Sequence, residues 1–380
     1  MKKTEYICQF TGHWSLVTGH YFYIIALLLL ATACQKVVEF DIDEIPSQLV
    51  LNALPSDGNP MFVNFAQSRF FLDTNIGSPV AYPSMTLNVT GPSGTLTLHP
   101  DSTSLSNYFF PYSPQGGDSL YITIHAGEST VTSGTKIPKP LQIPSCSTLL
   151  TWTLPSSGSS SQSVLNLCIV SFSLSDYADE DNYYYITVTE RDSGSWFRES
   201  LQKFDTIDTL YRNTMFMCMD NALAGSQALL SSPLVVLPQG YTVYDRLICN
   251  DKALNGSSAT HSIIIPILVD TNEVRGFKHQ LSFHIESIRP ERVRYLLDVA
   301  NATALTQMFA EPAGVFSNVK VNGEQALGLF SGISHLNFPL NTDPWPYPEN
   351  LNTTAEQSST HLPPDVVHEL YLTLKQRNKK

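Results

Sequence analysis

The chain has 380 residues, of which 42% are hydrophobic and 15% are charged, and its formal net charge is −12. The charged share lies well below the usual ~25%, so the composition excludes a disordered chain and a coiled coil. The acidic balance argues against nucleic acid as a partner, because a phosphate backbone binds basic surfaces. From the length, we expect a packed, water-soluble body of two or three domains.

The N-terminal segment has the organisation of a secretory signal. Two lysines precede an uncharged stretch of 13 residues that ends at Ala33. This stretch is too short to span a bilayer and has the length of a signal-peptide core. The small residues directly before Cys34 resemble a bacterial lipobox, although Ala31 stands where leucine is usual. The sequence therefore predicts a signal peptide at 1–33 and lipid attachment at Cys34; an ordinary secretory signal is the alternative.

The anchor predicts a location in the cell envelope. Lipid chains on one cysteine are enough for stable anchoring without insertion of the protein. Gln35 follows the cysteine where aspartate would signal retention at the inner membrane, which favours the outer membrane. Residues 34–46 are expected to form a tether, and its periplasmic or cell-surface side stays open.

The first folded region is expected at 47–137, where apolar and polar residues alternate. Segments such as Met61–Phe65 and Leu120–Ile124 show this period of two, which is typical of antiparallel strands with one buried face. Turn signals recur every 8 to 12 residues, as in an immunoglobulin-like β-sandwich. Alternate prolines in 138–144 predict a stiff, extended connector.

A second β-rich domain is expected at 145–336. Its clearest strand segments are 165–174, 183–189, 261–269 and 279–287. A helix is predicted near 290–304, because apolar residues recur there on one face, which should pack on a sheet. The tail, 337–380, is expected to be irregular, with a short helix over Asp365–Lys375. The fold class is therefore mainly β, with one packed helix.

Four cysteines remain in the folded region. They are Cys146, Cys168, Cys218 and Cys249. An oxidising compartment favours disulfides, and four cysteines allow three connectivities. Proximity in sequence suggests one bond between Cys146 and Cys168 and another between Cys218 and Cys249. Four buried free thiols are the alternative.

No motif of a serine hydrolase, a zinc protease or a nucleotide-binding loop occurs in the chain. His279 and His284 are five apart on a predicted strand, so their side chains point to opposite faces and cannot bind one metal. We therefore predict no catalytic residue, no metal ligand and no cofactor, and the chain is not expected to be an enzyme.

Two groups of residues could still bind a ligand. Asp176, Asp179, Glu180 and Asp181 form an oxygen-rich loop, which suits either Ca²⁺ or, as we favour, a solvated turn. The aromatic residues Trp152, Trp196 and those of 344–348 could stack on sugars or, as we favour, pack as ordinary surface residues.

Four segments together carry a family pattern: Asp176 with Asp181–Tyr184, Asn250–Gly256, Phe309–Val319 and Gly328–Gly332. They resemble the domain-of-unknown-function 4249 family of Gram-negative envelope lipoproteins. The resemblance extends over most of the chain after the signal. An insertion at 320–326 and a longer tail depart from the pattern. The resemblance implies a lipid-anchored β-rich protein, often encoded beside TonB-dependent receptors, with no established activity or catalytic residues.

The last of these motifs is expected to be structural. Its glycines suit turns, and Asn318 suits a side-chain cap on the backbone. We expect this segment to close the second domain beside the predicted helix. The functional alternative is that Glu311 and Asn318 line an edge that binds a partner.

Two functions follow as hypotheses. The first is a non-enzymatic accessory or binding component of a TonB-dependent outer-membrane receptor, held at the membrane by its lipid. The alternative is a surface protein that binds or hydrolyses carbohydrate, for which a pair of carboxylates ~5 to 9 Å apart in an aromatic cleft would be evidence.

Overall fold

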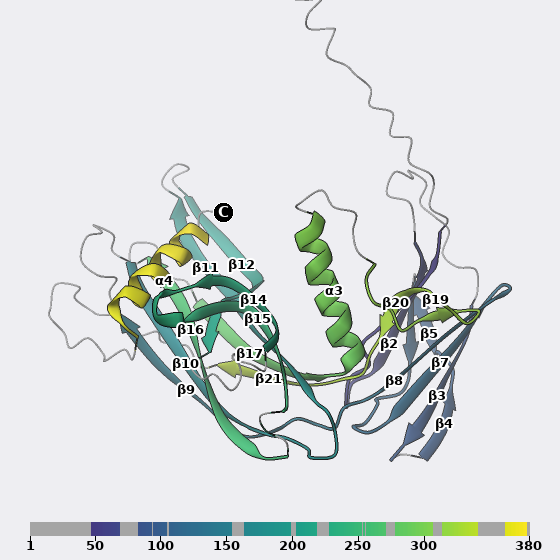
Figure 1. Ribbon diagram of the computed structural model, residues 1–380. Coiled ribbons are helices and arrows are strands. Elements are labelled where there is room, and N and C mark those ends of the chain that lie inside the picture. Colours follow the sequence, from purple (N-terminus) through teal and green to yellow (C-terminus); the bar gives the residue numbers. More distant parts are fainter. Residues whose placement is uncertain are drawn as a thin grey trace, which may run out of the picture. The chain divides into compact units, whose positions relative to one another are not determined.

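The computed structural model describes residues 47–68, 83–92, 94–104, 106–153, 163–198, 203–218, 228–252, 254, 256–270, 278–306, 314–340 and 362–377. This part of the chain is mainly β, as the alternating pattern predicts, and its strands form sheets of five, six and ten strands (Figure 1). The two smaller sheets make a sandwich, and the large sheet makes the second region.

The sandwich packs a five-stranded sheet on a six-stranded sheet. The first contains β1 (Leu49–Ala53), β2 (Met61–Gln67), β5 (Ser102–Ser104), β6 (Asn107–Phe110) and β20 (Leu327–Phe330). The second contains β3 (Ser84–Gly91), β4 (Gly94–Leu98), β7 (Ser119–Ala126), β8 (Ser129–Lys136), β18 (Lys320–Val321) and β19 (Glu324–Gln325). Alternate residues such as Leu51, Val63, Leu87 and Ile122 are fully buried in one core between the sheets.

Residues 320–330 belong to this sandwich, although the sequence led us to expect them in the second domain. Strand β20 pairs in parallel with β1, and β18 pairs antiparallel with β8. Val319 and Phe330 are fully buried in the core of the sandwich. In Figure 1 the yellow-green β19 and β20 lie among the blue N-terminal strands. The prediction was wrong because a period of two shows which face of a strand is buried, but not which sheet it joins.

The second region is one large sheet. Its strands are β9 (Gln142–Thr153), β10 (Ser163–Ser175), β11 (Tyr183–Arg198), β12 (Lys203–Asn213), β13 (Phe216–Cys218), β14 (Ala228–Val236), β15 (Thr242–Asn250), β16 (Ser258–Asp270), β17 (Lys278–Ile288) and β21 (Ile333–Leu340). The main path runs β21-β17-β11-β15-β13-β16-β10-β9, with β12 beside β11 and β14 beside β15.

This sheet curls around its own core. Phe172 on β10 and Phe283 on β17 are separated by four strands, yet their ring centroids are 4.8 Å apart. Neighbouring strands are ~4.8 Å apart, so in a flat sheet these rings would be more than 20 Å from each other. One face of the sheet is therefore an interior, filled by side chains from β10, β11, β15, β16 and β17.

Two helices pack on the outer face of the curled sheet. Helix α3 (Pro290–Thr306) confirms the predicted helix, and its Val293 packs with Ile288 and Ile333. Helix α4 (Pro364–Arg377) confirms the short helix expected in the tail. Its apolar face packs beside the 3-10 turn η2 (Pro238–Gly240), against a cluster from β10, β13, β15 and β16 (Figure 1). No helix in the described ranges is long and apolar enough to cross a membrane.

Candidate functional site

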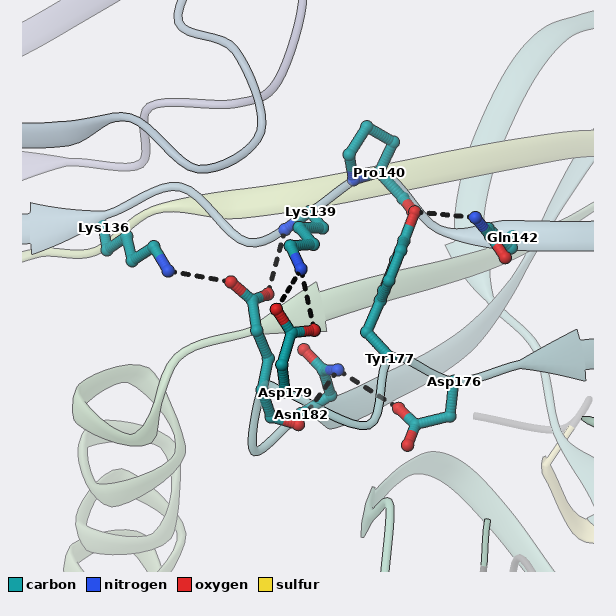
Figure 2. A network of polar contacts seen from close by, with 9 residues as sticks. Lys136, Lys139, Pro140, Gln142, Asp176, Tyr177, Asp179 and Asn182 are labelled. Atoms are coloured by element: carbon teal, nitrogen blue, oxygen red, sulfur yellow. Dashed lines mark hydrogen bonds and ion pairs between the residues drawn. The ribbon is translucent and has the colours of Figure 1, made fainter. Parts of the chain in front are cut away.

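The acidic loop between β10 and β11 fastens the connector that follows β8. Asp179 accepts hydrogen bonds from the Lys139 ammonium at 2.6 and 2.7 Å, and Glu180 forms an ion pair with Lys136 at 2.8 Å (Figure 2). The second oxygen of Glu180 accepts the backbone N–H of Lys139 at 3.3 Å. The hydrogen bond from Lys139 lowers the pKa of Asp179, since it favours the carboxylate.

Tyr177 adds a second set of contacts to the same connector. Its hydroxyl donates to the carbonyl of Pro140 at 3.0 Å and accepts from the Gln142 amide at 2.9 Å (Figure 2). The ammonium of Lys139 lies 4.9 Å from the ring centroid. The acidic loop therefore holds the connector between the sandwich and the large sheet. We call the contacts of Tyr177, Asp179 and Glu180 with residues 136–142 the clasp. Among the described residues, no group of three His, Cys, Asp or Glu side chains is arranged to bind a metal.

Behind the clasp lies a buried polar network. Asp176 accepts from the Tyr184 hydroxyl at 2.8 Å, the Asn182 amide at 3.1 Å and the backbone N–H of Gly256 at 2.8 Å. Asp251 accepts the backbone N–H of Asn182 at 2.6 Å. Burial raises the pKa of Asp251, and burial together with the bond to Asp176 raises the pKa of Tyr184. Residues from two segments that resemble the family thus meet in one network.

Asn318 lies in the return segment, residues 314–330, which leads from α3 back to the sandwich. Its side chain joins the start of this segment to β20 at the end. Its side-chain oxygen accepts the backbone N–H of Phe330 at 3.0 Å, and its amide donates to the Phe330 carbonyl at 2.7 Å. This is the backbone cap that the sequence predicts. Nearby, a Cβ added to Gly332 would lie 2.4 Å from the carbonyl oxygen of Lys136. The motif therefore packs closely against the backbone at the end of β8. Glu311, the other residue proposed for partner binding, lies outside the described residues.

An open pocket of about 500 Å³ lies between α3 and residues 314–316. Asp298 on the helix accepts the backbone N–H of Phe316 at 2.8 Å, which ties the segment to α3. Arg294 lies over the Phe316 ring, 5.1 Å from its centroid. The rest of the wall is formed by Leu297, Asn301, Gly314, Val315 and Gln325. The sequence did not lead us to predict this pocket. The spacing of Arg294 and Asp298, one helical turn apart, was a signal for a shared face.

Two of the described histidines, His284 and His335, have structural partners. His284 on β17 has a hydrogen bond of 2.7 Å with the hydroxyl of Thr189, and burial lowers its pKa. The side chain of His279 lies outside the described residues. His335 on β21 has a hydrogen bond of 2.8 Å with Ser56 of the sandwich, a contact that nothing in the local sequence indicated.

The expected disulfides are not formed, since none of Cys146, Cys168, Cys218 and Cys249 is bonded to another cysteine. In the β9–β10 register, Cys146 is opposite Phe172, four residues from Cys168. This offset corresponds to about 13 Å along the strand, whereas the Cα atoms of a disulfide lie within about 7 Å. Burial raises the pKa of the Cys168 thiol to about 12.

The second expected pair is farther apart. Phe216 on β13 pairs with Tyr244 on β15, and the two strands run antiparallel. Cys218 therefore lies level with a residue two positions before Tyr244, whereas Cys249 lies five positions after Tyr244. The two cysteines are therefore displaced by about seven strand positions, or more than 20 Å. The prediction from sequence proximity was wrong because adjacent strands run antiparallel, so residues near in sequence need not be opposite.

Several predicted residues lie outside the described part of the chain. Cys34 and residues 344–348 are among them, so lipid attachment stays a prediction. The backbones of Trp152 and Trp196 lie in β9 and β11, but their side chains are also outside the description. The sugar-binding hypothesis therefore gains no support.

Comparison with protein families gives a match that covers most of the chain. The model of a family described as a domain of unknown function, DUF4249, matches residues 35–337. None of the curated proteins compared with the chain matches it.

Three solved structures show distant similarity to the chain. A chaperone–tip adhesin complex of CFA/I fimbriae has 9% identity and a TM-score of 0.21, over 62% of this chain and 83% of that chain. CfaE, the adhesive subunit of CFA/I fimbria of enterotoxigenic Escherichia coli, has 8% identity and a TM-score of 0.18, over 77% and 87%. A biofilm associated protein B domain has 7% identity and a TM-score of 0.13, over 77% and 85%. These scores are too low to establish a shared fold.

Proposed function

We propose a binding function for this chain, which belongs to the DUF4249 family. In this proposal it is a lipid-anchored accessory protein of the outer membrane that performs no catalysis and associates with a TonB-dependent receptor. The resemblance noted in the sequence suggests the receptor, and the lipobox ending at Cys34 suggests the anchor.

One structural observation supports a scaffold that binds over one that catalyses. Three polar residues from the segments that carry the family resemblance are engaged inside the fold. Asp176 accepts three hydrogen bonds, Asp251 holds the Asn182 backbone, and Asn318 pairs with the backbone of Phe330. A carboxylate or amide with its bonds satisfied in this way is committed to the fold, since freeing it would leave buried partners unpaired.

The tether limits how far the sandwich could lie from a lipid on Cys34. Cys34 precedes the first described residue, Ser47, by 13 positions. Fully extended, this length spans at most about 45 Å. A lipid at Cys34 would therefore keep the sandwich close enough to the membrane surface to contact a receptor loop.

The experiment is a native-detergent pull-down of the full chain through a C-terminal tag, with mass spectrometry of its N-terminal peptide. We expect a peptide that begins at acylated Cys34 and a co-purified receptor. The variant Cys34→Ala should leave the membrane fraction.

The two parts of the experiment can fail separately. An unmodified N-terminus would contradict the anchor, and an acylated chain that captures no receptor would contradict the association. Capture of the receptor by detergent-extracted wild type and equally by Cys34→Ala would show that the protein surface, and not the lipid, makes the contact.

A further inference from the structure

We propose that the pocket between α3 and residues 314–316 binds the carboxylate of a short peptide segment. This inference goes beyond the receptor association and does not depend on it. The pocket lies where the helix of the second region meets the segment that returns to the sandwich. Its volume, about 500 Å³, falls within the usual range for small-ligand sites and suits a few amino-acid residues.

The walls of the pocket are held in place before any ligand binds. The bond from the Phe316 N–H to Asp298 fixes residues 314–316 against the helix. An ion pair of 2.8 Å between Arg292 and Glu286 fixes the first turns of α3 against β17. A ligand therefore meets a surface that needs little ordering, which lowers the entropic cost of binding.

Arg294 provides the positive charge that the ligand would meet. Its guanidinium lies over the ring of Phe316, and the side chain lines the pocket. Among the described residues, no carboxylate forms an ion pair with Arg294. A guanidinium presents paired N–H donors that match the two oxygens of a carboxylate.

The rest of the pocket favours a peptide as the source of this carboxylate. Leu297 and Val315, which is 38% exposed, give an apolar surface beside the charge. Gly314 and Val315 lie in an irregular segment, and their backbone groups have no partners among the described residues. An extended segment could therefore bond to this backbone while it places an apolar side chain on Leu297 and a carboxylate at Arg294.

Calorimetry on the detergent-solubilised full chain tests the site. The probes are acetyl-alanyl-leucyl-leucine with a free carboxylate, the same peptide with a C-terminal amide, and an amidated acetyl-leucyl-aspartyl-leucine. The free acid should bind at least about tenfold more tightly than its amide, as for a charge-assisted hydrogen bond. Binding of the internal aspartate instead would support the site and assign it to side-chain carboxylates.

Three variants complete the test. Arg294→Gln should weaken binding of the free acid about tenfold and remove the preference for the acid over the amide. Val315→Glu places a negative charge in the pocket and should have the same effect, so the test does not depend on one variant. Lys320→Gln removes the same charge from an exposed residue outside the pocket and should bind as wild type does.

Three results would overturn the proposal. They are equal affinities for the acid and its amide, equal effects of Arg294→Gln and Lys320→Gln, and no saturable binding of any probe up to about 5 mM.

Discussion

Gly328 stands where β20 runs beside β1 and leaves no space for a side chain. Its φ is +120°, and an added Cβ would lie 1.9 Å from the carbonyl oxygen of Leu51. Both the backbone angle and the contact require glycine, because other residues rarely adopt this φ and the nearest atom belongs to a paired strand.

We expect Gly328→Ala to lower the free energy of unfolding by more than about 3 kcal/mol, since strain and overlap add. Gly323→Ala is the matched control, because φ there is +90° but nothing lies within 4 Å of an added Cβ. The control should cost only about 1–2 kcal/mol. Urea unfolding measures both variants, and equal losses would show that the contact with Leu51 does not matter.

The buried carboxyl of Asp251 makes stability depend on pH in a defined direction. Burial raises its pKa above 3.8, the value for an exposed group. The unfolded chain therefore ionises more readily than the folded chain, and this group lowers stability as the pH rises through the interval above 3.8. The effect is absent at lower pH, where the group is protonated in both states.

Asp251→Asn should remove this dependence, because the amide oxygen can still accept the Asn182 N–H but does not ionise. We expect wild type to lose stability relative to the variant as the pH rises above 3.8. Denaturant unfolding at several pH values measures the difference. A difference that stays constant across this interval would contradict a raised pKa.

These residues also show what local sequence could and could not tell. Asn318 was predicted as a backbone cap, because asparagine readily bonds to nearby backbone and its partner Phe330 is only 12 residues away. The partner of Asp251 is 69 residues away in sequence. Only the pairing of β11 with β15 brings Asn182 and Asp251 together.

At the scale of elements, α4 covers part of the outer face of the curled sheet. Val366, Leu370 and Leu374 are buried in a cluster with Met217 and Ile264. Leu372 lies on the same helix but is 38% exposed. The helix is therefore held mainly by one apolar face, as is usual for short helices in proteins.

Leu370→Ala should lower the free energy of unfolding by about 2–4 kcal/mol, since it leaves a cavity under the helix. Leu372→Ala, on the exposed side, should cost less than about 1 kcal/mol. Denaturant melts of the two variants give the comparison. Similar losses would indicate that α4 does not pack on the sheet as described.

The clasp between the acidic loop and the connector has one protected and one exposed ion pair. The side chain of Glu180 is 5% exposed, whereas that of Asp179 is 70% exposed. Salt and solvent weaken exposed pairs, so the two carboxylates should contribute unequally.

We expect Glu180→Gln to lower stability by about 1–2 kcal/mol, because it weakens the bonds to Lys136 and to the Lys139 backbone. Asp179→Asn should change stability little, and its effect should vanish in high salt. Thermal melts at low and high salt test both variants. A larger loss for Asp179→Asn would overturn the ranking.

At the scale of the whole molecule, residues from Ser47 to Lys380 form one compact unit. The chain leaves the sandwich after β8, builds the curled sheet and α3, and then returns to add β18, β19 and β20. The sandwich therefore depends on residues nearly 200 positions beyond its other strands. Such late pairing has a high entropic cost of loop closure and is expected to slow folding.

A fragment of residues 47–137 should not fold stably by itself, because Val319 and Phe330 would be missing from its core and β1 would become an open edge. We expect broad, poorly dispersed NMR resonances and fast proteolysis for the fragment. The chain of 47–377 should resist protease under the same conditions. A fragment with dispersed resonances and a cooperative melt would show that the return segment is dispensable.

Features that depend on neighbouring residues could be predicted from the amino-acid sequence. Alternation established the mainly β class, and apolar spacing located α3 and the helix in the tail. Contacts between distant segments were decided only by the tertiary structure. They include the return of β20 to β1, the displacement of the cysteines and the pocket at Arg294. The physical reason is that a strand's pattern records the polarity of its two faces, whereas its partners are selected by the packing of the whole chain.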